Sequence, residues 1–213
     1  INRKRRLVKE WKFILEKDSY ITLSKHTTIE LKVQRSKFIA NAYPLSNPEE
    51  STDILNQTRK EYFDARHHPF AYVLFEKDNF RYNDDGEPSG TSGKPIYDAI
   101  NKHGFKNVLV VVTRYFGGIK LGVGGLKRAY FSAADDCLKI AERRNVILTD
   151  RKIIQFNYNY ISAVMKFIET NLITIVENKS TDVVILVCDV RLSLLDKFNT
   201  ELFDITKGTI LIY

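Results

Sequence analysis

The spacing of hydrophobic residues changes several times along this chain, and each change indicates a different kind of element. Apolar and charged residues alternate over residues 29–33, which predicts a strand with one exposed face. The uninterrupted apolar run of residues 108–112 predicts a strand that is buried on both faces. After a glycine-rich stretch, apolar residues recur at helical spacing over residues 126–141. Similar patterns predict strands at residues 38–43 and up to residue 75, and helices at residues 47–63 and from residue 94.

The last third of the chain has a regular pattern of its own. Residues 145–151 are predicted to be a link. Beyond the link, strands and helices are expected in the order β-α-β-β-α-β, which is the ferredoxin-like pattern. The predicted strands cover residues 152–158, 173–177, 183–190 and 209–213, and the predicted helices cover residues 162–171 and 193–203. The predicted fold class is therefore α+β, with an N-terminal domain over residues 19–147 and a C-terminal domain over residues 148–213.

A basic segment, residues 1–18, precedes these domains. It carries seven Lys or Arg and three Asp or Glu, so it holds +4 of the total net charge of +7. Residues 152–213 are slightly acidic, so an electropositive surface for nucleic acid belongs to the earlier parts of the chain. An amphipathic helix that covers the protein's own apolar surface is expected here, because four apolar residues share one helical stripe: Leu7, Trp11, Ile14 and Leu15.

The composition, 44% hydrophobic and 28% charged, is that of an ordinary globular protein. No apolar run is long enough to cross a bilayer, and the basic start lacks the apolar segment of a signal peptide. The two cysteines, Cys137 and Cys188, fall in apolar patterns, and no disulfide or zinc spacing is present. A cytoplasmic protein without a membrane partner is expected.

Five glycines lie within residues 117–125, between the buried strand and the following helix. Glycines allow positive φ angles and close approach of another group, and a helix start offers unpaired N–H groups and partial positive charge to an anion. The spacing is neither that of a P-loop nor that of a dinucleotide-binding fingerprint. The predicted anion or nucleic-acid site consists of Arg114, Tyr115, Gly117, Gly118, Lys120, Gly124, Gly125, Lys127 and Arg128.

A second unusual loop, residues 82–95, is rich in Asn, Asp, Gly, Pro and Ser. Its carboxylates allow two interpretations: they bind a hard cation such as Mg²⁺, or they pair with Arg114 or Lys120 across the fold. Because the EF-hand spacing is absent, ion pairing or anion recognition is favoured, and no cofactor is expected. The acidic residues of the loop are Asp84, Asp85 and Glu87, and its other candidate residues are Ser89, Thr91 and Lys94.

The adjacent residues His67 and His68 lie just before a predicted strand. Side chains of neighbouring residues in an extended chain point to opposite faces, so these two histidines do not share a metal without a turn. No serine or cysteine motif accompanies them, so a hydrogen-bonded structural role is favoured over general acid–base catalysis for His67 or His68. No catalytic residue is predicted.

Two long motifs, residues 84–95 and 112–130, strongly resemble the signature blocks of the IMPACT/YigZ family. Residues 36–39 and 65–68 resemble its earlier short motifs, and the resemblance covers roughly residues 20–145. It implies an N-terminal domain like one found in a small-subunit ribosomal protein. It also implies a ferredoxin-like C-terminal domain similar to the last domain of elongation factor G. Eukaryotic members carry an extra N-terminal domain and regulate translation, whereas this chain looks like the bacterial type.

Three hypotheses for the function follow. The leading one is a non-catalytic cytoplasmic module that binds RNA or another translation component, with phosphates held at the glycine-rich loop. The second is a phosphate- or nucleotide-binding enzyme that uses Mg²⁺ at the acidic loop. The third is a protein-interaction module in which the glycines only permit tight strand–helix packing. Direct contact between Arg114 and the acidic loop would leave little chemistry for a substrate and would count against the second hypothesis.

Overall fold

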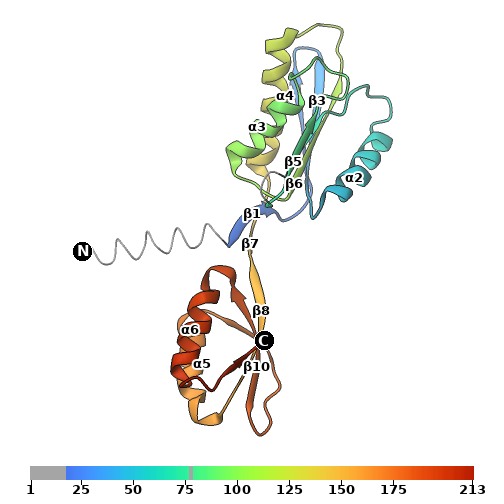
Figure 1. Ribbon diagram of the computed structural model, residues 1–213. Coiled ribbons are helices and arrows are strands. Elements are labelled where there is room, and N and C mark those ends of the chain that lie inside the picture. Colours follow the sequence, from blue (N-terminus) through green and yellow to red (C-terminus); the bar gives the residue numbers. More distant parts are fainter. Residues whose placement is uncertain (1–17, 77–78) are drawn as a thin grey trace, which may run out of the picture. The chain divides into compact units, whose positions relative to one another are not determined.

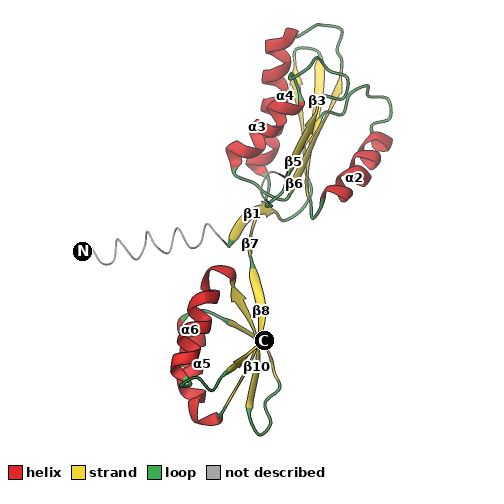
Figure 2. Ribbon diagram, in the orientation of Figure 1, coloured by secondary structure: helices red, strands yellow, loops and turns green. Residues whose placement is uncertain are grey.

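The computed structural model describes residues 18–76 and 79–213. These residues form two compact units (Figures 1 and 2). One comprises residues 20–146, and the other comprises residues 147–213 together with Asp18 and Ser19. Both units are mixed α+β, as the hydrophobic pattern predicted. The predicted amphipathic segment, residues 1–18, lies almost wholly outside the described residues.

The first unit is built on a five-stranded sheet of order β2-β3-β6-β4-β5, in which every neighbouring pair is antiparallel. Helices α3 and α4 cover one face of this sheet and α2 covers the other (Figure 1). The strands are β2 Thr27–Val33, β3 Ser36–Pro44, β4 Phe70–Val73, β5 Phe80–Asn83 and β6 Val108–Tyr115, and the helices are α2 Pro48–Glu61, α3 Gly93–His103 and α4 Gly122–Ile140.

The central strand β6 explains why the sheet has helices on both faces. Successive side chains of a strand point to opposite faces. Val108, Val110 and Val112 are fully buried among the residues of α3 and α4. Leu109 and Val111 are fully buried on the side of α2. The predicted strand that is buried on both faces is confirmed.

The second unit contains a four-stranded antiparallel sheet of order β11-β8-β10-β9. Its core lies between the sheet and its two helices. The predicted β-α-β-β-α-β order is confirmed, and the sheet order is that of a split β-α-β arrangement. The elements are β8 Thr149–Phe156, α5 Ile161–Thr170, β9 Thr174–Asn178, β10 Val184–Arg191, α6 Leu195–Ile205 and β11 Leu211–Ile212, with short 3₁₀ turns at Tyr158–Tyr160 and Leu192–Leu194.

The sequence pattern missed two strands near the boundary of the units. Residues 145–151 join the two units as predicted, but they fall in β7 (Arg143–Ile147) and in the start of β8 and are not irregular. Strand β7 pairs with β1 (Ser19–Leu23), which the pattern did not predict. Most side chains of β7 are exposed, so its sequence shows no hydrophobic alternation. Its strand conformation depends on backbone pairing.

No helix in the described parts of the chain is both long enough and apolar enough to span a membrane.

Candidate functional site

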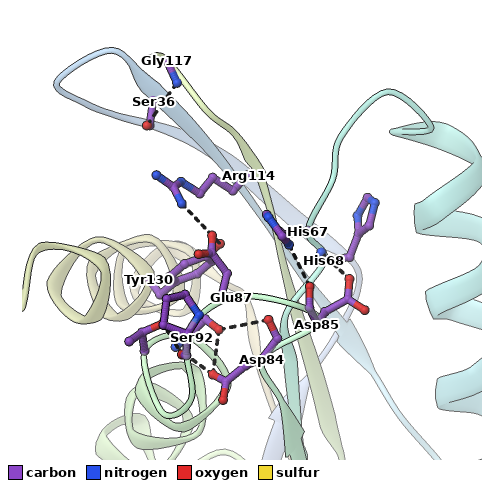
Figure 3. A network of polar contacts seen from close by, with 12 residues as sticks. Ser36, His67, His68, Asp84, Asp85, Glu87, Ser92, Arg114, Gly117 and Tyr130 are labelled. Carbon is purple, nitrogen blue, oxygen red and sulfur yellow. Dashed lines mark hydrogen bonds and ion pairs between the residues drawn. The ribbon is translucent and has the colours of Figure 1, made fainter. Parts of the chain in front are cut away.

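The two signature loops are joined by a buried ion pair between Arg114, near the end of β6, and Glu87. Nη1 of Arg114 lies 2.7 Å from Oε1 of Glu87, and the two side chains are 8% and 3% exposed. The hydroxyl of Tyr130, from α4, donates a second hydrogen bond of 2.7 Å to the same oxygen (Figure 3). Burial, together with the nearby charge of Glu87, raises the pKa of Tyr130 far above its usual value. Arg114 is therefore a buried, paired cation and not part of an open electropositive surface.

The carboxylate of Asp84 caps the N-terminus of α3, although Asp84 lies outside the helix. Its Oδ1 accepts hydrogen bonds from the backbone N–H groups of Ser92 and Gly93, at 3.0 and 2.8 Å, and from the hydroxyl of Ser92 at 2.8 Å. Its Oδ2 accepts from the N–H of Gly90 at 2.8 Å. Burial by itself would raise the pKa of Asp84, but these hydrogen bonds outweigh burial and hold the pKa below its usual value. Asp84 thus acts as a helix cap.

The third acidic residue, Asp85, also has partners within the protein. Its Oδ2 accepts from the backbone N–H of His68 at 2.7 Å, and its Oδ1 lies 3.0 Å from Nη2 of Arg59. Within residues 18–76 and 79–213, no group of three or more His, Cys, Asp or Glu side chains is arranged to hold a metal ion. The Mg²⁺ hypothesis therefore gains no support from this loop.

Both adjacent histidines are hydrogen-bonded, as the structural interpretation expected. Nδ1 of His67 lies 2.8 Å from the carbonyl oxygen of Asp85, so this nitrogen must carry the proton and donate it. Nδ1 of His68 lies 3.1 Å from the hydroxyl of Thr113, and burial lowers the pKa of His68.

The remaining candidates of the acidic loop have local roles or none. The buried hydroxyl of Thr91 donates to the carbonyl of Pro88 at 2.6 Å. Lys94 forms an exposed ion pair with Asp98. Ser89 is exposed.

The glycine-rich loop packs closely against the turn between β2 and β3. A Cβ atom at Gly117 would lie 1.8 Å from the carbonyl oxygen of Arg35, so only glycine fits there. The N–H of Gly117 points to the hydroxyl of Ser36, 3.3 Å away (Figure 3). This first glycine therefore serves packing. Gly118 is exposed and has a φ of 84°.

Helix α4 begins earlier than expected, at Gly122, which has a φ of 68°. Gly124 and Gly125 therefore lie in its first turn. The N-cap residue, Leu121, has no side-chain group that caps the helix, and the first turn contains no acidic residue. Among the residues that the structure describes, no side chain caps the first N–H groups of this 19-residue helix, and no acidic residue of the first turn offsets its partial positive charge.

Three exposed cations surround this helix start: Lys120, Lys127 and Arg128. None of them has an ion-pair partner in the described part of the chain. The structure thus divides the predicted anion site into an open part at the start of α4 and a closed part around Arg114.

Tyr115, the other predicted site residue, has its contacts with residues outside the start of α4. Its hydroxyl donates to the carboxylate of Asp64 at 2.7 Å. Burial and the hydrogen bond to Asp64 raise the pKa of Tyr115 to about 12. The ammonium group of Lys37 lies 4.6 Å from the centre of its ring.

Known proteins resemble this chain in sequence. The model of the Impact N-terminal domain matches residues 34–138, which include both signature loops. IMPACT family member YvyE of Bacillus subtilis is 39% identical over 130 residues, 59% of this chain and 60% of that protein. IMPACT family member YigZ of Escherichia coli is 27% identical over 197 residues, 91% of this chain and 96% of that protein.

The chain belongs to the IMPACT/YigZ family.

This IMPACT/YigZ family member matches different shares of the length of its relatives. The match to YvyE spans about 60% of the length of that protein, whereas the match to YigZ spans nearly all of it. The protein IMPACT homolog of Dictyostelium discoideum is 37% identical over 95 residues, only 27% of its length. A crystal structure described as that of a hypothetical protein superimposes with a TM-score of 0.64 at 25% identity and covers 92% of this chain and 96% of its own.

One pocket of this IMPACT/YigZ family member was missed by the sequence analysis. It has a volume of about 430 Å³ and lies where residues 64–67 run beside the end of β6. Its lining includes Arg66 and Phe116, which were not candidates. Arg66 belongs to a short motif in which only the histidines were considered. Phe116 could have been recognised from the sequence, because it is an aromatic residue directly before two glycines.

Proposed function

We propose that this protein is a non-catalytic, cytoplasmic RNA-binding module that holds RNA phosphates at the start of α4. The observation that carries the proposal is the uncapped first turn of α4 with three exposed cations around it, Lys120, Lys127 and Arg128. Unpaired N–H groups at a helix start bind phosphate oxygens, and Lys and Arg side chains supply the charge.

The paired acidic loop favours this function over the enzymatic one. Asp84, Asp85 and Glu87 are all hydrogen-bonded within the protein. A metal ion at this loop would therefore have to compete with hydrogen bonds that these carboxylates already accept within the protein. A site made of N–H groups and cations supports binding of the phosphate backbone without a catalytic group.

The connection of the proposal to translation rests on the family resemblance. The family resemblance implies a domain like one of a small-subunit ribosomal protein and a second domain similar to the last domain of elongation factor G. The split β-α-β order of residues 149–212 is compatible with the second of these. We therefore propose structured RNA of the translation machinery as the partner.

The test is the salt dependence of RNA binding by the full chain. If each of the three cations neutralises one phosphate, log K should fall with log salt with a slope of roughly −2 to −3. The triple variant Lys120→Ala, Lys127→Ala, Arg128→Ala should bind weakly and lose most of this slope. A matched triple, Lys60→Ala, Lys139→Ala, Arg144→Ala, removes the same charge from exposed positions away from the start of α4 and should bind nearly as the parent does.

Equal weakening by the two triple variants would show that only net charge matters and would contradict a site at α4. Absence of RNA binding by the parent chain would favour the protein-interaction module instead.

A further inference from the structure

We infer that the pocket beside the end of β6 accepts one unpaired nucleotide of the bound RNA, with its base on Phe116 and its phosphate on Arg66. This inference rests on the proposed function and deepens it, because it names the feature of the RNA that this chain prefers. The pocket volume of about 430 Å³ falls in the range of small-molecule sites, roughly 300–1,000 Å³.

The pocket is held in place by strand pairing. His67 and Arg114 form an antiparallel bridge, and the N–H of Arg114 donates to the carbonyl of His67 at 3.1 Å. Phe116 follows two residues after this bridge, and Arg66 precedes it by one. The segments that carry the two proposed contact residues are therefore fixed relative to each other by backbone hydrogen bonds.

Phe116 is positioned for stacking. Its side chain is 56% exposed, although it is a large aromatic residue. The guanidinium carbon of Arg114 lies 5.4 Å from the centre of the ring and covers one side. The rest of the ring is open to a partner, and nucleic-acid bases stack on such aromatic rings without regard to sequence.

The polar lining of the pocket favours an anion. Arg66 is exposed and has no ion-pair partner among the residues that the structure describes. Asp64, the acidic residue of the lining, already accepts the hydrogen bond of the Tyr115 hydroxyl. The free guanidinium of Arg66 therefore suits a phosphate group, which it can bind through two parallel hydrogen bonds.

Arg114 supplies an independent sign that the pocket is incomplete. It is 8% exposed, and its Nε is buried without a hydrogen-bond partner among the described residues. Buried donors are rarely left unpaired, and such a group indicates a missing water, ion or ligand. Arg114 lines the same pocket as Arg66 and Phe116, so an acceptor atom of the ligand or of a water that it orders would complete the site.

The experiment compares a blunt RNA duplex with the same duplex carrying one unpaired nucleotide, each titrated with the full chain. The parent should bind the RNA with the unpaired nucleotide more tightly. Phe116→Ala and Arg66→Ala should each weaken that complex about tenfold, since stacking and phosphate contacts have this magnitude, and leave the blunt duplex unchanged. Adenosine monophosphate should weaken binding of the RNA with the unpaired nucleotide towards that of the blunt duplex. Inorganic phosphate at the same concentration should weaken it less.

Two controls match the substitutions in exposure. Phe203 is 57% exposed and lies in the other unit, so Phe203→Ala tests loss of an exposed aromatic ring elsewhere. Arg144→Ala tests loss of an exposed arginine outside the pocket. Neither should change the preference for the unpaired nucleotide.

The outcomes separate this inference from the proposed function. Equal binding of the two RNAs, with no effect of Phe116→Ala, overturns the inference and leaves RNA binding at α4 intact. Binding of adenosine monophosphate that Phe116→Ala abolishes, without binding of any duplex, supports the pocket and overturns the proposed function. Competition by inorganic phosphate as strong as that by adenosine monophosphate shows an anion site without a base contact and also overturns the inference.

Discussion

Arg114 and Glu87, which are 27 positions apart in the chain, form a buried ion pair of 2.7 Å between the end of β6 and the loop before α3. A buried pair of opposite charges gives little net stability compared with apolar residues, but loss of one partner leaves the other charge buried and alone. Loss of either partner should therefore destabilise both signature loops, because one residue of the pair lies in each loop.

Glu87→Ala should destabilise the unit of residues 20–146 by about 3–5 kcal/mol, because it leaves the guanidinium of Arg114 buried without its carboxylate. Hydrogen exchange of the β6 amide groups measures this, since central strands exchange through unfolding. Asp98→Asn breaks the ion pair with Lys94, in which both side chains are about half exposed, and should cost about 1 kcal/mol or less. Similar costs for the two variants would contradict the assignment of Glu87 as a buried partner.

Tyr130→Phe should cost about 1–3 kcal/mol, because Tyr130 is fully buried and its hydroxyl is a donor to Glu87. The substitution should also be coupled to Glu87→Gln. In a double-mutant cycle measured by the same exchange experiment, the combined loss should differ from the sum of the single losses by more than about 0.5 kcal/mol. Additive losses would show that the two side chains do not act together.

The order of elements in the second unit, and the helices and central strands of the first, could be predicted from the sequence, because burial alternates strongly where sheets pack against helices. Strand β5 could not, because all its residues are exposed at the edge of the sheet. Strand β7 is exposed at most positions for the same reason. In both strands the conformation depends on backbone pairing with a partner that the local sequence does not reveal.

The sequence indicated candidate residues for a site but not how they are arranged. The cations and glycines of residues 114–128 were identified as a group, yet Arg114 is buried and Lys120 is exposed. The alternation of β6 decides the burial of Arg114, because this residue falls on the same face as Val112 and points towards α4. The sequence offered pairing of Arg114 with the acidic loop as one alternative, but only the fold brings Glu87 to it.

Asp84→Asn should reduce the dependence of stability on pH in acid. The pKa of Asp84 is lower in the folded protein than in the unfolded chain, so the unfolded chain binds more protons. The stabilisation is fully present above the unfolded pKa, about 3.9, and is lost as pH falls through the lower folded pKa. Urea unfolding of parent and variant at a series of pH values measures the difference.

The parent should be more stable than Asp84→Asn at neutral pH, and the two should converge in acid. Asp136→Asn serves as the control, because Asp136 is an exposed carboxylate without a hydrogen bond among the described residues. A constant difference between parent and Asp84→Asn down to the lowest pH would argue against the ionised cap.

Substitutions at two glycines of residues 117–125, one in the loop and one in α4, should have opposite effects on stability. Gly117→Ala places a Cβ atom 1.8 Å from the carbonyl oxygen of Arg35, so the loop or the β2–β3 turn must move, at a cost of about 1–3 kcal/mol or more. Gly124→Ala meets nothing closer than 3.5 Å, an Nη1 atom of Arg128, and lies in a helix. There alanine should stabilise the protein by about 0.5–1 kcal/mol.

Thermal unfolding of the two variants measures both effects. Destabilisation by Gly124→Ala as large as that by Gly117→Ala would mean that the loop needs glycine throughout, and the division into a packed first half and an open helix start would be wrong.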